Sequence, residues 1–376
     1  MPPIHPPTYP PSPAWFSAIH QSSIINPPFL TLRLDPRFRL GSLLKFIIHH
    51  SAFILFFAAS GCGDPSASAP GTGTPADPSA TAAALPPVGI WQDEDPYLRG
   101  YDALAEAVAD LSTNIRVLHT GAHPDDENSD LMAYLARGRH FRTAYLSATR
   151  GEGGQNGIGP ETGEALGVIR TEELLAARRI DGAEQYFLSA PDFGFSKSAA
   201  ETLKIWGEEK TLKELVHFIR WYRPQVIVSV FSGTPFDGHG HHQAIGQLTR
   251  EAFDAAADPA FKDDLPPWTT QLLFQSLWRD PGEEKLPGQR FTIDTGQYDA
   301  LLGKTYHQIA MDGRSQHRSQ DMGAAQDPGP HPITLRLWST SKQFHNPDKI
   351  EEPFGPTLDP FPDSLTSTQL TDLLTL

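Results

Sequence analysis

Cysteine is almost absent from this chain, since Cys62 is the only one among its 376 residues. A lone cysteine cannot form a disulfide within the chain, and it cannot supply the several thiolates of a cysteine-based structural zinc site. The fold must therefore be stabilised by a hydrophobic core, and the length allows one large α/β domain with extensions.

Basic residues are scarce relative to acidic ones. The chain has 30 Lys and Arg against 45 Asp and Glu, which gives a formal net charge of −15 at pH 7. Proteins that bind nucleic acid neutralise phosphates with clustered Lys and Arg, so this charge argues against a nucleic-acid partner. A solvated acidic surface is the plainer interpretation of the excess.

Apolar runs long enough to cross a membrane are also missing from the N-terminal region. The apolar stretch at residues 46–59 is interrupted by two histidines and is shorter than the ~20 residues of a transmembrane helix. Basic residues precede it and small residues end it, which is typical of a secretory signal. The run closes as Ala59-Ser60-Gly61-Cys62, which resembles the box of bacterial lipoproteins; a linker cysteine is the alternative. We expect an exported protein, held at a membrane by a lipid on Cys62 or released outside it.

Composition divides the chain into four segments. Residues 1–62 form an N-terminal extension and leader, and residues 63–90 are an Ala, Pro, Gly and Ser linker with too few bulky apolar residues to fold. Residues 91–325 mix apolar and charged residues as globular domains do. Residues 326–376, rich in Pro and polar residues, stay unassigned. The sequence therefore predicts a single folded domain behind a flexible tether.

Strand and helix patterns alternate through this domain. Strands are predicted at 115–120, 143–147, 185–188, 226–230 and 272–274, and helices at 101–111, 131–138, 164–182, 199–221 and 240–256. Such alternation implies βαβ crossovers, hence a three-layer, Rossmann-like α/β fold with a mainly parallel sheet. In sheets of this kind the active site lies at the carboxyl ends of the strands.

Polar residues follow two of these strands directly. The segment Ala122-His123-Pro124-Asp125-Asp126-Glu127 comes after the first strand, and Asp237-Gly238-His239-Gly240-His241-His242 comes after the fourth. His123 and Asp126 offer a nitrogen and an oxygen ligand, and His242 would be the third ligand of a zinc site that keeps one position open for water. The alternative is a polar loop and a surface cluster of histidines.

These segments resemble the signature of the PIG-L/LmbE-like family of metal-dependent N-deacetylases, an AHPDDE loop after the first strand followed by a later HxxH. The resemblance continues through residues 150–156 and 166–174, and it covers about residues 114–257. It implies a hydrolase that removes an N-acetyl group from an amino-sugar-containing small molecule or glycan. It also implies one divalent ion, usually Zn²⁺, with Fe²⁺ as the alternative.

The roles of the family's residues carry over position by position. The resemblance implies that His123, Asp126 and His242 bind the metal. It implies that Asp125 is the general base, which takes a proton from the water that attacks the acetamide carbonyl. His239 would stabilise the resulting oxyanion or protonate the departing amine.

Two further positions complete the comparison. The family's helix arginine corresponds to Arg170, which would contact the substrate or instead pair with a nearby acid such as Glu173. Many members have Asp directly before the last histidine, where it orients His239, but this chain has His241 there. We expect Asp237 to take over that orienting role.

Two other functions are compatible with the same motifs. The metal site could hydrolyse another linear amide, because the metal fixes the reaction and the pocket walls fix the substrate. A non-catalytic carbohydrate-binding surface lipoprotein is the second alternative. An intact Asp125 favours an enzyme, since binding alone needs no base.

Overall fold

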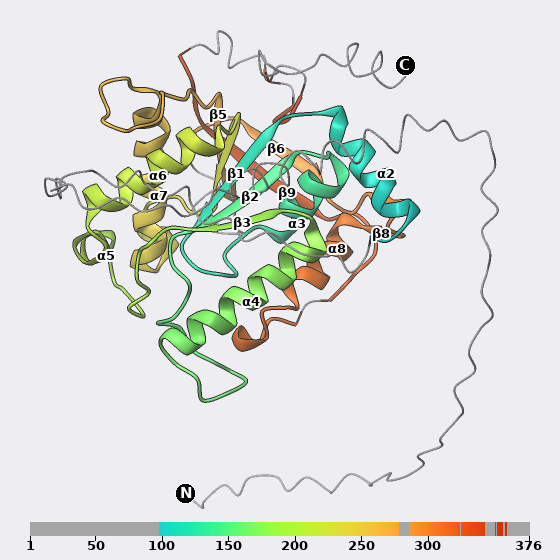
Figure 1. Cartoon of the computed structure of the whole chain (residues 1–376), viewed down its shortest axis with the longest axis horizontal. Helices are drawn as coiled ribbons and strands as arrows, with labels where there is room; N and C mark the ends of the chain where they lie inside the picture. Colours follow the sequence, from blue (N-terminus) through green and yellow to red (C-terminus); the bar gives the residue numbers. More distant parts are fainter. Residues whose placement is uncertain are drawn as a thin grey trace, which may run out of the picture. The chain divides into compact units, whose positions relative to one another are not determined.

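The computed structural model describes residues 98–277, 286–323, 325–342, 350, 352–355 and 358. The predicted leader, the linker and Cys62 lie outside the described residues. Within the described part of the chain, no helix is both long and apolar enough to span a membrane. The main elements, shown in Figure 1, are the helices α2 (Tyr101–Ala109), α3 (Ser129–Ala133), α4 (Glu164–Asp181), α5 (Ala199–Trp206), α6 (Glu208–Tyr222), α7 (Gly240–Ala257) and α8 (Tyr306–Arg314), and the strands β1 (Arg116–Gly121), β2 (Arg142–Ser147), β3 (Glu184–Phe187), β4 (Val226–Ser229), β5 (Leu272–Leu277), β6 (Arg290–Asp294), β7 (Tyr298–Asp299), β8 (Lys304–Thr305) and β9 (Pro332–Thr340).

A mixed sheet forms the centre of the fold. Among the described residues it has seven strands, in the order β3-β2-β1-β4-β5-β9-β6. The pairs from β3 to β5 are parallel, whereas β9 runs antiparallel to both β5 and β6. The strand order changes direction at β1 and β4, so the switch point of the sheet lies at their carboxyl ends. The predicted α/β fold with a mainly parallel sheet is confirmed.

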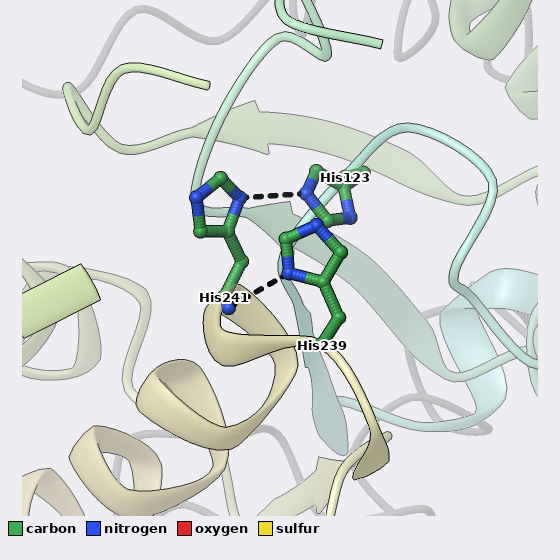
Figure 2. Close-up of side chains that lie close together, drawn as sticks. All are labelled: His123, His239 and His241. Atoms are coloured by element: carbon green, nitrogen blue, oxygen red, sulfur yellow. Dashed lines mark hydrogen bonds between the residues drawn. The ribbon is translucent and has the colours of Figure 1, made fainter. Parts of the chain in front are cut away.

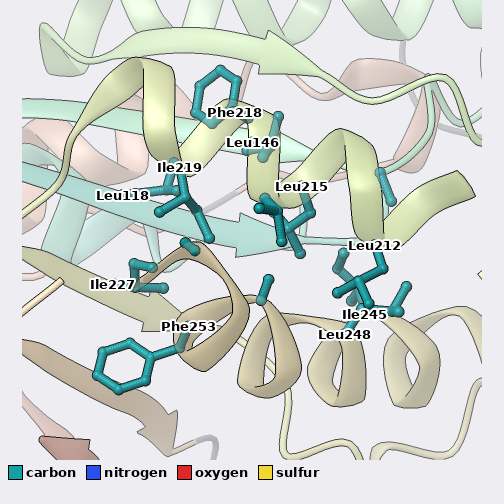
Figure 3. Close-up of a cluster of buried hydrophobic side chains, with 14 of the residues drawn as sticks. Leu118, Leu146, Leu212, Leu215, Phe218, Ile219, Ile227, Ile245, Leu248 and Phe253 are labelled. Carbon is teal, nitrogen blue, oxygen red and sulfur yellow. The ribbon is translucent and has the colours of Figure 1, made fainter. Parts of the chain in front are cut away.

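Helices cover both faces of the sheet (Figure 1). On one face α6 and α7 bury Leu215 and Leu248 against Leu118 of β1 (Figure 3). On the other face α3 packs Leu131 against Val117, which directly precedes Leu118 in β1 and points to the opposite side of the sheet. Helices α4 and α8 pack beside α3. Alternate side chains of a strand point to opposite faces. The central strands are therefore buried on both sides, which explains the adjacent apolar residues in them, such as Val117 and Leu118.

Two helices differ from their predicted form. The helix predicted at 199–221 is two helices, α5 and α6, which are separated at Gly207. The φ angle of Gly207 is 78°, in the left-handed region that favours glycine. The apolar residues whose spacing predicted α2, such as Leu104 and Leu111, are about half exposed, and Glu106 is the buried residue of that helix.

The sheet extends beyond the boundary predicted at residue 325. Strand β9 comes from the unassigned tail and lies between β5 and β6, where Leu335 is fully buried. None of β6, α8 and β9 was predicted. The partner of β9 in β5 lies about seventy residues earlier in the chain, as the pair Leu272 and Thr340 shows, so no local pattern revealed the pairing.

Candidate active site

The two predicted motifs meet at the carboxyl ends of β1 and β4. These strands are neighbours in register, with Thr120 of β1 beside Ser229 of β4. The loop after β1 carries residues 122–127, and the loop after β4 leads into α7. His239 caps the N-terminus of α7 in extended conformation, and His242 lies in its first turn. The fold thus brings together residues more than a hundred positions apart.

His123, Asp126 and His242 bring two ring nitrogens and one carboxylate around one point. The Nδ1 atom of His123 lies 3.2 Å from Nε2 of His242 and 3.3 Å from Oδ2 of Asp126. The Nε2 atom of His242 lies 3.5 Å from Oδ1 of Asp126. Ligands about 2.0–2.2 Å from a tetrahedral ion lie about 3.3–3.5 Å from one another. The donor set and its spacing therefore fit a divalent metal ion.

Neighbouring groups fix two of these ligands. The Oδ2 atom of Asp126 accepts backbone hydrogen bonds from Ala122 and His123, at 3.0 and 2.7 Å. Nδ1 of His242 lies 3.3 Å from the carbonyl oxygen of Asp237, and the ring of His242 stacks on Phe231. Burial alone would raise the pKa of Asp126, but the two histidines outweigh it and hold that pKa well below its usual value.

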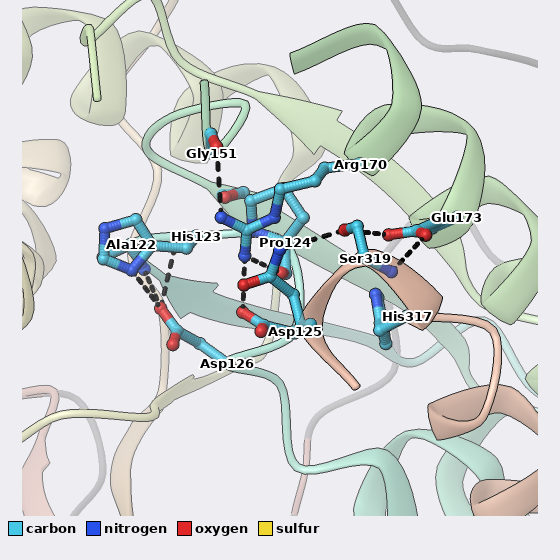
Figure 4. Close-up of polar contacts among 12 residues, drawn as sticks. Ala122, His123, Pro124, Asp125, Asp126, Gly151, Arg170, Glu173, His317 and Ser319 are labelled. Carbon is cyan, nitrogen blue, oxygen red and sulfur yellow. Dashed lines mark hydrogen bonds and ion pairs between the residues drawn. The ribbon is translucent and has the colours of Figure 1, made fainter. Parts of the chain in front are cut away.

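Asp125 is held in an unusual backbone conformation (Figure 4). Its φ angle of 114° is in a region that L residues rarely adopt. The backbone N–H of Asp125 donates to Oε2 of Glu127 at 3.1 Å, and its Oδ1 accepts from Nη2 of Arg170 at 3.0 Å. Burial raises the pKa of Asp125 to about 6, although Arg170 opposes the rise. The carboxylate is thus bonded to Arg170 and is not part of the donor triad, as expected for a group that is not a ligand.

Arg170 is buried, with 3% of its surface exposed. Its guanidinium donates to the carbonyl oxygens of Gly151 and Pro124, at 3.1 and 2.7 Å, in addition to Asp125. Its alternative partner, Glu173, instead accepts hydrogen bonds from Ser319. Arg170 therefore joins the loop after β1 to the glycine-rich loop, and its contact with a substrate stays a prediction.

His239 is oriented by the backbone and not by Asp237. Nδ1 of His239 accepts a hydrogen bond from the backbone N–H of His241 at 3.0 Å. The carboxylate of Asp237 instead accepts hydrogen bonds from the backbone N–H and the hydroxyl of Ser232, and from the backbone N–H groups of the two residues after Ser232. The expectation that Asp237 orients His239 is therefore wrong. Burial lowers the pKa of His239 to about 4, with nearby His123 and His242 adding to the effect.

The structure adds a residue and a network that the sequence did not predict. Asp192, in the loop after β3, places its Oδ2 3.9 Å from Nε2 of His123. Beneath the loop after β1, Glu127 is bonded to the fully buried Arg178 at 2.9 Å and to His317 at 3.3 Å. Asp192 could have been predicted as a site residue, because it is a carboxylate in the loop that follows a parallel strand. His317 is 190 residues from its partner, so no spacing rule could find it.

A mainly parallel α/β sheet, with two histidines and an aspartate at its switch point that could hold a metal ion, defines the class of this protein. The profile of the family described as PIG-L, GlcNAc-PI de-N-acetylase, matches residues 118–253. A 1D-myo-inositol 2-acetamido-2-deoxy-alpha-D-glucopyranoside deacetylase of Streptomyces avermitilis is 30% identical over 204 residues, which cover 47% of this chain and 68% of that protein. The chain belongs to the PIG-L/LmbE-like family of metal-dependent deacetylases.

Other similar proteins are matched over different shares of their length. A deacetylase of the same name from Geodermatophilus obscurus is 34% identical over 174 residues, which cover 41% of this chain and 58% of that protein. The N,N'-diacetylchitobiose deacetylase of Pyrococcus horikoshii is a solved structure with 18% identity and a TM-score of 0.41, covering 59% of this chain and 80% of that one. The 4-carboxy-2-hydroxymuconate hydratase of Pseudomonas putida has 17% identity and a TM-score of 0.43, covering 60% and 97%. Because both scores are low, the sequence relatives alone carry the family assignment.

Proposed function

We propose that this protein is a divalent-metal-dependent N-deacetylase that hydrolyses the acetamide of an amino sugar. The position of Asp125 carries the proposal. Its carboxylate belongs to the loop that supplies two of the three donors, yet it is bonded to Arg170 and left out of the donor triad. A hydrolytic site needs such a base beside its ligands, and the relatives at 30–34% identity are named as deacetylases of a 2-acetamido sugar.

The side chains divide the reaction between them. His123, Asp126 and His242 would hold a divalent ion, which would acidify a water molecule and polarise the amide carbonyl. Asp125 accepts the proton from the attacking water and returns it to the amine nitrogen as the C–N bond breaks, and its hydrogen bond with Arg170 keeps one carboxylate oxygen fixed. His239 accepts a backbone N–H at Nδ1, so its ring proton lies on Nε2. That N–H donates to the substrate oxygen as negative charge develops there.

We propose zinc as the metal. Two imidazole nitrogens and one carboxylate, with an open fourth position, are typical of catalytic zinc sites. The same donor set with open positions also occurs in non-haem iron sites, so Fe²⁺ is the alternative. Metal-free protein reloaded with each ion separately and assayed at equal occupancy distinguishes the two, and higher activity with Fe²⁺ would exclude zinc as the better cofactor.

The substrate class is tested with a panel of acetylated compounds. Metal-loaded protein is incubated with N-acetylglucosamine, its glycosides, including an inositol glycoside, and simple acetamides. We expect equal amounts of free amine and acetate from one or more sugars and none from metal-free protein. Hydrolysis of the simple acetamides alone would favour the linear-amide alternative. No hydrolysis of any compound would refute the deacetylase.

The anchor is a separate proposal that rests on sequence. An apolar run closed by Ala59-Ser60-Gly61-Cys62, followed by a linker without bulky apolar residues, supports export and a lipid on Cys62. Lipidation there would tether the folded domain to a membrane surface by the segment that precedes residue 98.

A further inference from the structure

The two ring nitrogens of His123 face different surroundings. Nδ1 faces the donor triad, 3.2 Å from His242 and 3.3 Å from Asp126. Nε2 points the other way, 2.9 Å from Nδ1 of His241 (Figure 2) and 3.9 Å from Oδ2 of Asp192. A 2.9 Å separation is that of a good hydrogen bond. One nitrogen of His123 is therefore available to a metal while the other is bonded within the protein.

His241 is enclosed where its ring can meet only a few groups. It is fully buried, with its ring 4.4 Å from that of Phe193 and 5.0 Å from that of Trp206, both measured between centroids. Its backbone N–H, and not its side chain, is what orients His239. The side chain of His241 can therefore bond to His123. In many family members an aspartate at this position orients the residue that corresponds to His239 instead.

We infer that His241 and Asp192 are positioning residues that set the tautomer of the metal ligand His123. A histidine that binds metal through Nδ1 must carry its proton on Nε2, and this proton needs a buried acceptor. Nδ1 of His241 is that acceptor. The carboxylate of Asp192, 3.7 Å from Nδ1 of His241 and 3.9 Å from His123, adds negative potential beside the donated proton.

Asp192 is itself held in place, which makes this support rigid. Its Oδ1 accepts from the backbone N–H of Gly194, and its own N–H donates to Oε1 of Glu152, both at 2.9 Å. The side chain of Asp192 is only 3% exposed. The loops after β1 and β3 and the first turn of α7 are thereby linked at one proposed metal ligand, and the inference rests on the proposed metal site.

The donor atoms of His123, His239 and His241 also lie within 4.8 Å of one another, so a second metal ion bound by these three residues is the alternative. A second ion there would require His123 to lose both ring protons and bridge two metals. The hydrogen-bonded arrangement needs no such ionisation, so we take His241 as the acceptor from His123.

The test measures metal affinity, so it is independent of catalysis. Zinc affinity is determined by competition with a chelator for the wild type and for His241→Phe, His241→Asn and Asp192→Asn, with the melting temperature of each metal-free form as a check of folding. His241→Phe keeps an aromatic ring but lacks the acceptor, and we expect zinc binding about 10–100-fold weaker. His241→Asn places an amide oxygen near the position of Nδ1 and should stay within about threefold of the wild type. Asp192→Asn should weaken binding by a smaller factor, about three- to tenfold.

A histidine-selective NMR spectrum of the zinc-loaded wild type reads the tautomer directly, and we expect the proton of His123 on Nε2. A proton on Nδ1, two zinc ions per chain, or unchanged affinity in both His241→Phe and Asp192→Asn would overturn the inference. If His241→Phe does not fold, Asp192→Asn and the NMR spectrum decide. A protein that shows these affinity changes but deacetylates nothing would keep this inference and lose the proposed function.

Discussion

At the scale of single residues, the backbone of Asp125 shows how the site is held. A φ of 114° is costly for a residue with a side chain, by roughly 1–3 kcal/mol. Glu127 and Arg170 oppose that cost by bonding the backbone and the carboxylate of Asp125. Glu127 is in turn bonded to the buried Arg178. The proposed base is therefore positioned by its own loop and by two arginines of helix α4.

We predict that Asp125→Asn separates chemistry from metal binding. Asn is similar in size and is among the residues that most often adopt positive φ, so the fold and the metal should be retained. Because the side chain can no longer take a proton, turnover should fall by about 10²–10⁴-fold. Asp254→Asn, an exposed change on α7, is the matched control. Wild-type turnover of Asp125→Asn at equal metal content would place the base elsewhere.

The metal donors give a second prediction at this scale. His242→Ala removes one of three donors, so metal occupancy measured by elemental analysis should fall about tenfold or more. His331→Ala, outside the donor triad, should keep its metal. Equal metal content in His242→Ala and the wild type would show that His242 is not a ligand.

The sequence predicted which residues meet at the site but not how their side chains pair. Strand-end position was enough to bring His123 and His242 together, because adjacent parallel strands end at one edge of the sheet. Spacing gave no information on rotamers. By spacing alone, Arg170 could equally pair with Glu173 on its own helix, and the carboxylate of Asp237 could equally bond to His239. Only the packed loops decide that Arg170 binds Asp125 and that Asp237 binds its own loop.

At the scale of elements, local patterns predicted the parallel strands and missed the antiparallel side of the sheet. The parallel strands β1 to β5 each contain two or more adjacent apolar residues, and all five were predicted. Strand β9 alternates apolar residues such as Leu335 with polar ones, but its place in the sheet is decided by pairing with β5 and β6. Helix α2 is amphipathic in sequence, but it attaches through the buried Glu106.

The attachment of α2 predicts a pH-dependent stability. Nδ1 of His140 lies 3.1 Å from Oδ1 of Asp110 and 3.3 Å from Oε2 of Glu106. Hydrogen bonds to Asp110 and Glu106 raise the pKa of His140 to about 9, above its value of about 6.5 in the unfolded chain. The stabilisation is therefore fully present below pH 6.5 and is lost as the pH rises through 9.

Because Asp110 is well exposed, we expect this contribution to be roughly 1 kcal/mol at most. Unfolding is measured by denaturant titration between pH 6 and pH 10 for the wild type and for His140→Asn, which tolerates the positive φ of 54° at this position. The stability difference between the two should shrink as the pH rises. A difference that is constant across this range would show that His140 is not charged in the folded protein.

At the scale of the whole molecule, the C-terminal part of the described chain completes both the sheet and the site. Strand β9 closes the antiparallel side of the sheet, and His317 bonds Glu127 beneath the loop of the proposed base. Ser319 bonds Glu173 of the helix that carries Arg170. The site of this family member therefore depends on residues well outside the matched segment 118–253.

The position of the domain relative to a membrane gives the last prediction. If Cys62 carries a lipid, the full-length protein produced in a bacterium should partition into the detergent phase and incorporate labelled fatty acid, and Cys62→Ser should abolish both. Ser60→Ala, beside the cysteine but without its thiol, is the matched control and should keep the label. Cys62 lies far along the sequence from the donor triad, so turnover per mole of detergent-solubilised protein should be the same in Cys62→Ser and the wild type. A wild-type protein recovered wholly in the aqueous phase without label would leave Cys62 as a linker residue and the domain unanchored.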